Sequence, residues 1–254
     1  MNTAKRKLEG KIAVITGGNS GIGRATAQLF NQEGARIALI GRDQTSIDET
    51  LAELSGENVG FKGDVTSAKD LNGFFDQVRS RFGKIDILFI NAGIAEQSMI
   101  ADTSPEFYDR HFNINVRGAF FAVQKALPLL QKGSSIVVTT SVVSHFGGAG
   151  SSVYSATKAA LRSMVQCWAA ELLPEGIRVN SVSPGPTATS IINRNVADEK
   201  AFEPILEFMK AMVPMKRMGE PLEVAKAVLF MASEDSSFTT GAELMVDGGM
   251  TQVR

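Results

Sequence analysis

Residues 12–23 read IAVITGGNSGIG, an apolar run that leads into three spaced glycines and the start of an amphipathic helix. Gly17 allows a sharp bend, Gly21 lets the backbone approach a bound group closely, and Gly23 lets helix and strand pack together. The first amides of the helix then face and attract an anion. The stretch predicts a turn that binds a pyrophosphate, although its GxxxGxG spacing leaves an ordinary glycine-rich turn as the alternative.

Apolar runs rich in valine and isoleucine recur along the chain and alternate with helical stretches. Such runs are typical of strands buried on both faces of a sheet, and the alternation favours right-handed crossovers. We therefore expect an α/β fold with a mainly parallel, doubly wound sheet. No linker, repeat or change of composition divides the chain, so 1–254 is expected to be a single domain. The expected strands include 12–16, 36–40, 87–90, 136–139, 177–182 and 243–246.

Composition narrows the partners to small molecules. The formal net charge is −1, which gives no general attraction to nucleic acid or to an anionic membrane surface. One cysteine and two histidines make neither an internal disulfide nor a zinc-ligand cluster, so no metal site is expected and a reducing cytoplasm is the expected location. The longest stretch without charge, 133–157, is diluted by Ser, Thr and Gly and predicts no membrane span.

The end of the second expected strand bears on the choice of cofactor. A dinucleotide fold has its ribose-recognising residue here, and the chain has Gly41 followed by Arg42 rather than a carboxylate. An acid would bind the adenosine ribose hydroxyls of NAD, whereas arginine can pair with the 2′-phosphate of NADP. We expect NADP(H) to be favoured over NAD(H). The alternative is a solvated loop arginine with Asp43 as its partner.

Two further strand ends are expected to cradle the adenosine, because open parallel sheets bind ligands at this edge. They are Gly63-Asp64-Val65 and Asn91-Ala92-Gly93. Asp64 has a second interpretation, as the cap of the helix that begins near Ser67.

Tyr154 and Lys158 lie early in an expected helix and share one face, since they are four residues apart. Tyrosine has a pKa of about 10, and acting near neutral pH requires a shift of about 4 kcal/mol. An ammonium at about 4 Å supplies an interaction of roughly that size. A YxxxK pair can also arise by chance in a chain of this composition. The motifs around it therefore decide whether the pair is catalytic.

Those surroundings contain further motifs in a fixed order. They are TGGNSGIG at 16–23, NAG at 91–93, NVRG at 115–118, Ser141 at a strand end, YSATK at 154–158 and Pro184-Gly185. Together they resemble the classical short-chain dehydrogenases and reductases over nearly the whole chain, from about Leu8 to Gly249. The resemblance implies a Rossmann-type domain with a seven-stranded sheet, and an NAD(P)-dependent enzyme that acts on CH-OH groups.

The resemblance also implies roles for the site residues. Tyr154 is the acid or base on the substrate oxygen, and Ser141 polarises that oxygen. Lys158 holds the nicotinamide ribose and lowers the pKa of Tyr154, while Asn115 positions a water that relays protons to Lys158. The expected cofactor-binding residues are Gly17, Asn19, Ser20, Gly21, Ile22, Gly23, Arg42, Asp64, Val65, Asn91, Ala92, Gly93, Tyr154, Lys158, Pro184, Gly185, Thr187 and Thr189.

Ser20 stands where many NADP-dependent relatives carry a basic residue, which weakens the expected preference for NADP. His145 follows Ser141 by four residues, and a packing or capping role is favoured for it because no orienting carboxylate is evident.

The segment 187–218 carries apolar residues suited to a substrate lid, such as Ile191, Ile192 and Phe202. An amphipathic helix packed on the core explains them equally well.

The expected reaction is hydride transfer between NADP(H) and a ketone or secondary alcohol. Reduction of a 3-oxoacyl thioester of acyl-carrier protein is the alternative, disfavoured by Glu171 and Glu175 where a basic patch would help. A non-catalytic NADP-binding sensor is the alternative from another class. The helices around Phe120 and Trp168 are apolar on nearly all sides, which predicts a homotetramer, with a dimer as the second choice.

Overall fold

The apolar runs form the strands of one sheet, with the order β3-β2-β1-β4-β5-β6-β7. The computed structural model describes residues 6–189 and 199–253. Within them every neighbouring pair of strands is parallel. The strands are β1 (Ile12–Thr16), β2 (Arg36–Gly41), β3 (Val59–Lys62), β4 (Ile85–Ile90), β5 (Leu130–Thr139), β6 (Arg178–Pro184) and β7 (Glu243–Val246). The predicted seven-stranded parallel sheet is confirmed.

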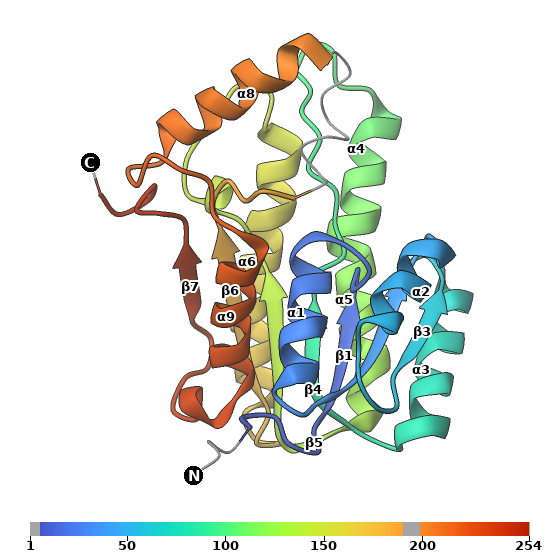
Figure 1. The fold of residues 1–254 in the computed structure, drawn as a ribbon. Helices are drawn as coiled ribbons and strands as arrows, with labels where there is room; N and C mark the ends of the chain where they lie inside the picture. Colours follow the sequence, from blue (N-terminus) through green and yellow to red (C-terminus); the bar gives the residue numbers. More distant parts are fainter. Residues whose placement is uncertain (1–5, 190–198, 254) are drawn as a thin grey trace.

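Helices cover both faces of this sheet (Figure 1). They are α1 (Gly21–Gln32), α2 (Gln44–Ala52), α3 (Ala68–Phe82), α4 (Pro105–Phe112), α5 (Ala119–Ala126), α6 (Ser152–Leu172), α8 (Glu199–Met212) and α9 (Pro221–Ala232). Residues of α3, α5 and α6 share one apolar core with the strands, and residues of α1 and α9 share the other. Alternate residues of β1 serve the two cores, Val14 in the first and Ile15 in the second. This explains why the strands are apolar without alternation.

The strand order sets where the site lies. From β1 the chain builds outward through β2 and β3, then returns to add β4 on the other side of β1. This reversal is a topological switch point, and ligands of open α/β sheets bind at the carboxyl ends of the strands there. The glycine turn follows β1, and Asn91 follows β4, at this same edge.

The stretch between α4 and α5 contains one feature that the sequence did not predict. Asn113–Gly118 forms a π-helical turn that joins the two helices into one continuous rod. Single π turns of this kind are common at functional sites because they redirect a side chain. Asn115 lies in this turn and is completely buried.

The expected lid falls partly outside the described residues. Ile191 and Ile192 lie in the undescribed 190–198 segment, and the side chain of Phe202 is not described either. Helix α8 runs across the end of the molecule beyond the carboxyl edge of the sheet (Figure 1). The lid over 187–218 therefore stays a prediction. None of the described helices combines the length and the apolar character that crossing a membrane requires.

Candidate active site

The glycine turn has the backbone geometry that its sequence predicts. Gly17 and Gly21 adopt positive φ angles of 64° and 50°. A Cβ on Gly23 would lie 2.0 Å from the carbonyl oxygen of Gly17, so no larger residue fits there. Backbone conformation at Gly17 and Gly21, and close packing at Gly23, therefore explain why these positions are glycine.

The start of α1 fits a phosphate group. Ser20, at the N-cap, makes no side-chain hydrogen bond to the helix, and the first turn holds no acidic residue. Helices α2, α3 and α4 differ, because Asp43, Ser67 and Ser104 cap them through their side chains. The first amides of α1 are thus left without a side-chain cap, and together with the helix dipole they suit the pyrophosphate of a dinucleotide. Asn19, Ser20 and Ile22 all lie in this turn.

Asn91 braces the turn from the neighbouring strand. Its backbone N–H donates to Thr16 Oγ1 at 2.9 Å, and its Nδ2 donates to the carbonyl oxygen of Gly17 at 3.2 Å. Its Oδ1 accepts from Thr139 Oγ1 at 3.3 Å. A Cβ on Gly17 would lie 3.0 Å from Ala92 Cα, so these two strand ends are in close contact. The Asn91 side chain therefore holds β1, β4 and β5 in register at the switch point.

The ribose end of the site is shaped by Asn19. Its Nδ2 donates to Ser46 Oγ at 2.7 Å, which holds the side chain across Gly41. A Cβ on Gly41 would lie 2.3 Å from Asn19 Oδ1. An acidic residue at position 41 would therefore require the Asn19 side chain to move.

Basic residues flank this position. Arg42 is exposed, and in the described part of the chain its side chain makes no ion pair or hydrogen bond. Asp43, its partner in the alternative interpretation, instead accepts from Ser46 N at 3.0 Å as the cap of α2. Lys62 pairs in register with Gly41 at the end of β3. Sequence reasoning missed Lys62, because only strand pairing brings it beside Gly41.

Asp64 does not cap α3, which settles one alternative. Its Oδ1 accepts from the backbone N–H and the hydroxyl of Thr66, both at 2.8 Å, and Ser67 is the cap instead. Val65 lies against the π turn, since a Cβ on Gly118 would come within 2.9 Å of its side chain. Asp64 and Val65 thus follow β3 at the ligand edge, and contact with adenosine remains their predicted role.

Ser141, Tyr154 and Lys158 come together beside this edge. Ser141 follows β5 and is nearly buried, and its hydroxyl hydrogen-bonds to the phenol of Tyr154. Lys158 lies one helical turn beyond Tyr154, with Nζ 5.9 Å from the centre of the tyrosine ring. The Nζ donates to the carbonyl oxygen of Thr139 at 2.9 Å. A serine hydroxyl, a phenol and an ammonium thus form one cluster suited to proton transfer.

Burial is the main influence on the electrostatics of the cluster. Burial raises the pKa of Tyr154, and the hydrogen bond from Ser141 acts in the opposite direction. Burial lowers the pKa of Lys158 to about 8. The Lys158 ammonium donates to Thr139 and is itself desolvated, and the lowering of the tyrosine pKa by Lys158 stays a prediction. A lysine with a pKa of about 8 is, however, well matched to exchanging protons near neutral pH.

Asn115 connects the π turn to the catalytic helix. Its Oδ1 accepts from Ile94 N at 2.8 Å, and its Nδ2 donates to the carbonyl oxygen of Ile94 at 2.9 Å and to Thr157 Oγ1 at 3.0 Å. Thr157 is fully buried and its hydroxyl donates to the carbonyl oxygen of Tyr154 at 2.7 Å. Thr157 was missed, because a threonine within a helix carries no sequence signal for this bond.

Glycine 93 lies where its lack of a side chain matters. A Cβ on Gly93 would lie 3.1 Å from Asn115 Oδ1 and 3.7 Å from Lys158 Nζ. The strand end after β4 therefore approaches both residues closely. This brings the NAG motif and the catalytic cluster into one site.

The segment after β6 approaches the glycine turn. A Cβ on Gly21 would lie 3.3 Å from Thr189, so position 189 is beside the phosphate turn. Thr187 Oγ1 donates to the carbonyl oxygen of Gly185 at 2.9 Å, so this hydroxyl is used within its own loop. Gly185 itself packs on Asp247, whose Cα would lie 2.8 Å from an added Cβ. Pro184 ends β6 in register with Val246.

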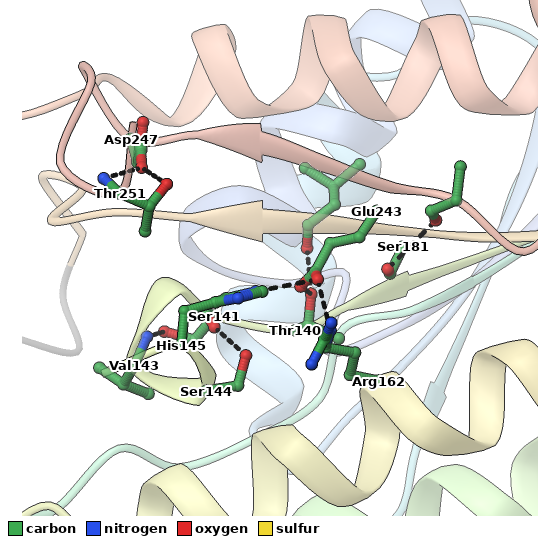
Figure 2. A network of polar contacts seen from close by, with 12 residues as sticks. Thr140, Ser141, Val143, Ser144, His145, Arg162, Ser181, Glu243, Asp247 and Thr251 are labelled. Atoms are coloured by element: carbon green, nitrogen blue, oxygen red, sulfur yellow. Dashed lines mark hydrogen bonds and ion pairs between the residues drawn. The ribbon is translucent and has the colours of Figure 1, made fainter. Parts of the chain in front are cut away.

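His145 has an orienting carboxylate after all. Glu243, at the start of β7, lies 2.9 Å from His145 Nε2 (Figure 2). The sequence alone does not reveal this pair, because 98 positions separate the two residues. The expectation of a simple packing or capping role is therefore incomplete.

The parallel sheet with its switch point, the uncapped glycine turn and the Ser-Tyr-Lys cluster define a nicotinamide-dependent oxidoreductase. Comparison with known proteins narrows the class. Residues 17–251 match the family model described as enoyl-(acyl carrier protein) reductase. The chain belongs to the short-chain dehydrogenase/reductase family, as the order of its motifs predicted.

Individual relatives span nearly the full chain. Oxidoreductase asL5 of Sarocladium schorii is 40% identical over 99% of this chain and 100% of its own length. The 3-oxoacyl-[acyl-carrier-protein] reductase FabG of Thermotoga maritima is 36% identical, over 96% of this chain and 99% of its own. A crystal structure of a glucose/ribitol dehydrogenase-type member from Brucella melitensis superposes with a TM-score of 0.90 at 35% identity, covering 97% and 98% of the two chains. These names differ in substrate.

Proposed function

We propose that this enzyme interconverts a free ketone and a secondary alcohol with NADP(H), using Tyr154 as the acid and base. The observation that carries the proposal is the meeting of Ser141, Tyr154 and Lys158 at the ligand edge of the sheet. The phenol is hydrogen-bonded to Ser141, and the ammonium lies one turn away on the same helix. This is the arrangement that protonation of a carbonyl oxygen requires.

Each residue has a defined role in the reduction of a ketone. The Ser141 hydroxyl hydrogen-bonds the carbonyl oxygen and polarises it, and Tyr154 donates its proton to that oxygen. Lys158 returns a proton toward Tyr154 and holds the ribose hydroxyls, while Asn115 fixes the chain around Ile94 and orders the water that supplies the proton. A bound nicotinamide supplies or accepts the hydride. The same residues act in reverse in alcohol oxidation.

The preference for NADP(H) rests on the charge and shape beside Gly41. Arg42 is exposed and free to meet a phosphate, and Lys62 at the end of β3 adds a second positive charge nearby. The Asn19 side chain occupies the space beside position 41, where a carboxylate would bind the ribose of NAD, and it would have to move for an acid to fit there. Both features favour a 2′-phosphate.

A second candidate is reduction of a 3-oxoacyl thioester on acyl-carrier protein. The similarity to the reductase of Thermotoga maritima favours it. Glu171 and Glu175 are exposed at the end of α6 and would repel an acidic carrier there, so the free ketone leads. A non-catalytic sensor has no need for a buried lysine beside a tyrosine, and is the least supported reading.

We propose that the chain is one domain over 1–254 that works as a homotetramer in the cytoplasm, with a lid over 187–218. Support for assembly comes from apolar side chains left exposed on α5 and at the ends of α5 and α6, namely Phe120, Leu127 and Leu173. Trp168 gives no support, because it is already buried within the single chain against Phe120. The lone thiol, Cys167, is compatible with a reducing compartment.

A substrate panel tests the proposal. Ketones, diketones, sugars and acyl thioesters are each mixed with the purified enzyme and with NADPH or NADH, and the absorbance of the reduced cofactor is followed. We expect turnover of at least one free ketone, faster with NADPH. Turnover confined to acyl thioesters would favour the second candidate, and binding of NADPH without any turnover, in either direction, would favour the sensor.

A further inference from the structure

Glu243 is the centre of a polar network next to the catalytic cluster (Figure 2). Its side chain is only 12% exposed. Oε1 accepts from Thr140 Oγ1 at 3.0 Å, and Oε2 accepts from Arg162 Nε and from His145 Nε2, both at 2.9 Å. Since an ionised carboxylate only accepts hydrogen bonds, Nε2 is the protonated nitrogen of His145. One carboxylate on β7 thus gathers two donors from the short segment 140–145 and one from α6.

Two of those donors flank Ser141. Thr140 directly precedes it, and His145 follows the short helical turn Val142–Ser144 that Ser141 caps. Within the turn, Ser144 Oγ donates to the carbonyl oxygen of Ser141 at 2.8 Å. That bond gives the turn its shape, whereas the two bonds to Glu243 tie both of its ends to β7. The Thr140 end is also bound to β6, since its backbone N–H donates to the carbonyl oxygen of Val182 at 2.9 Å, so the carboxylate chiefly fixes the His145 end and, through it, the orientation of the turn that carries Ser141.

The third donor belongs to the catalytic helix. Tyr154, Lys158 and Arg162 recur every four residues, so they lie along one stripe of α6. Arg162 is the member of this stripe that binds Glu243. The guanidinium is about half exposed, and such a pair contributes little to stability on its own. Its consequence is geometric, because it joins the Ser141 turn and the Tyr154 helix through one carboxylate.

We propose that Glu243 is a positioning residue that sets the Ser141 hydroxyl against the Tyr154 phenol. The inference rests on the proposed function, since it assigns Glu243 to the same reaction. It acts through Ser141 and touches neither substrate nor cofactor. A displacement of a polarising group by about 1 Å can lower a rate by as much as a hundredfold, so the network is expected to govern turnover rather than binding.

The test compares Glu243→Gln with the matched control Glu57→Gln. Glu57 also lies between two arginines, Arg36 and Arg81, but just before β3, at the opposite edge of the sheet. For Glu243→Gln we expect kcat to fall about tenfold, with the Kd of NADPH and the KM of NADPH changed by less than about twofold. Glu57→Gln should leave all three unchanged. An unchanged kcat, or a loss confined to KM, overturns the inference.

A double-mutant cycle separates positioning from general loosening. If Glu243 acts through Ser141, then Glu243→Gln should cost little further kcat when added to Ser141→Ala. Two losses that multiply would overturn the inference. If Ser141→Ala alone leaves kcat unchanged, the proposed function fails instead, so the two failures are distinguishable.

A second pair of variants tests the inference even if the Glu243→Gln protein does not fold. His145→Ala removes one donor from the partly exposed turn, and His145→Gln keeps an N–H at that end. We expect His145→Ala to lower kcat several-fold and His145→Gln to restore most of it. Equal kcat values for both variants and the unaltered enzyme would overturn the inference.

Discussion

Lys158 Nζ donates a 2.9 Å hydrogen bond to the backbone carbonyl oxygen of Thr139, the last residue of β5. The Thr139 hydroxyl in turn donates to Asn91 Oδ1, and Asn91 holds the glycine turn through Gly17. The catalytic ammonium is thus fixed to the backbone of the sheet rather than to a carboxylate. This anchoring leaves a buried cation whose pKa burial lowers to about 8.

The first prediction is that Lys158→Met stabilises the protein at pH 7 and abolishes turnover. Folding takes the lysine pKa from 10.5 to about 8, which corresponds to about 3 kcal/mol of destabilisation below pH 8. Losing the bond to Thr139 offsets about 1 kcal/mol, so we expect a net gain of about 2 kcal/mol. Urea unfolding at pH 7 measures it.

The pH dependence of that gain identifies its cause. Between pH 8 and 10.5 the unfolded chain binds more protons at Lys158 than the native one, so the native enzyme grows more stable as pH rises. The advantage of Lys158→Met should therefore shrink over this range and be gone above it. Lys69→Met, at an exposed position of α3, is the control and should change little. A gain that stays constant from pH 7 to 10.5 would contradict the argument.

The second prediction concerns Tyr154→Phe. It removes the proton donor without changing the shape of the side chain, so turnover should fall by about two to four decades while the Kd of NADPH changes only a few-fold. Stopped-flow or steady-state absorbance with the best ketone from the substrate panel measures the loss. The control is Tyr108→Phe, at the other tyrosine of the chain, which is exposed on α4. Turnover like that of the unaltered enzyme would refute the role of Tyr154.

The centre of the sheet could be predicted closely from the sequence, because β1, β2 and β4 are apolar runs that are almost wholly buried. Residues 12–16 and 243–246 form strands with the expected bounds. The 136–139 run was expected too short, since β5 begins at Leu130 with polar residues that leave no apolar signal. The π turn around Asn115 was not predicted either, because no residue pattern in NINVRG distinguishes a π turn from an α-helical one.

The candidate site was predictable where one short motif carries the geometry. Spacing alone puts Tyr154 and Lys158 on one face of a helix, and the glycines predict the turn after β1. Contacts between residues far apart in the sequence produce no such local motif. Lys62, Thr157 and Glu243 reach the site only through strand pairing or long-range hydrogen bonds. Finding them required the register of the strands, which a single sequence does not specify.

The third prediction is that Arg42→Asp moves the cofactor preference from NADPH toward NADH. The change replaces a phosphate partner with a group that repels phosphate and can accept from ribose hydroxyls. We expect the ratio of kcat/KM values for the two cofactors to shift by about tenfold or more. Arg79→Asp, the same change on the surface of α3, should leave the ratio unaltered. An unaltered ratio for Arg42→Asp would remove Arg42 from the site.

The fourth prediction concerns the crowding of Gly41 by Asn19. Gly41→Asp alone should lower folding stability and weaken binding of both cofactors, because its Cβ would lie 2.3 Å from Asn19 Oδ1 and push the Asn19 side chain away from Ser46. Adding Asn19→Gly should restore folding stability and NADH binding but not NADPH binding. Thermal unfolding and fluorescence titration measure the two effects. Tight NADH binding by Gly41→Asp alone would contradict the prediction, because it would show that the Asn19 side chain moves aside without weakening cofactor binding.

The last prediction is the homotetramer. Phe120 stays 39% exposed after the chain has folded, and Leu127, at the end of the same helix, is 38% exposed. Apolar side chains on neighbouring helices are stabilised when a second copy covers them, and a two-fold axis would pair the same face of both copies. Light scattering at micromolar concentration should give about four times the 27.2 kDa chain mass. Phe120→Glu should lower that mass, whereas Ile100→Glu, on an exposed turn, should not. A stable, active monomer would refute the prediction, because it would show that the apolar face around Phe120 and Leu127 does not have to be buried against a second copy.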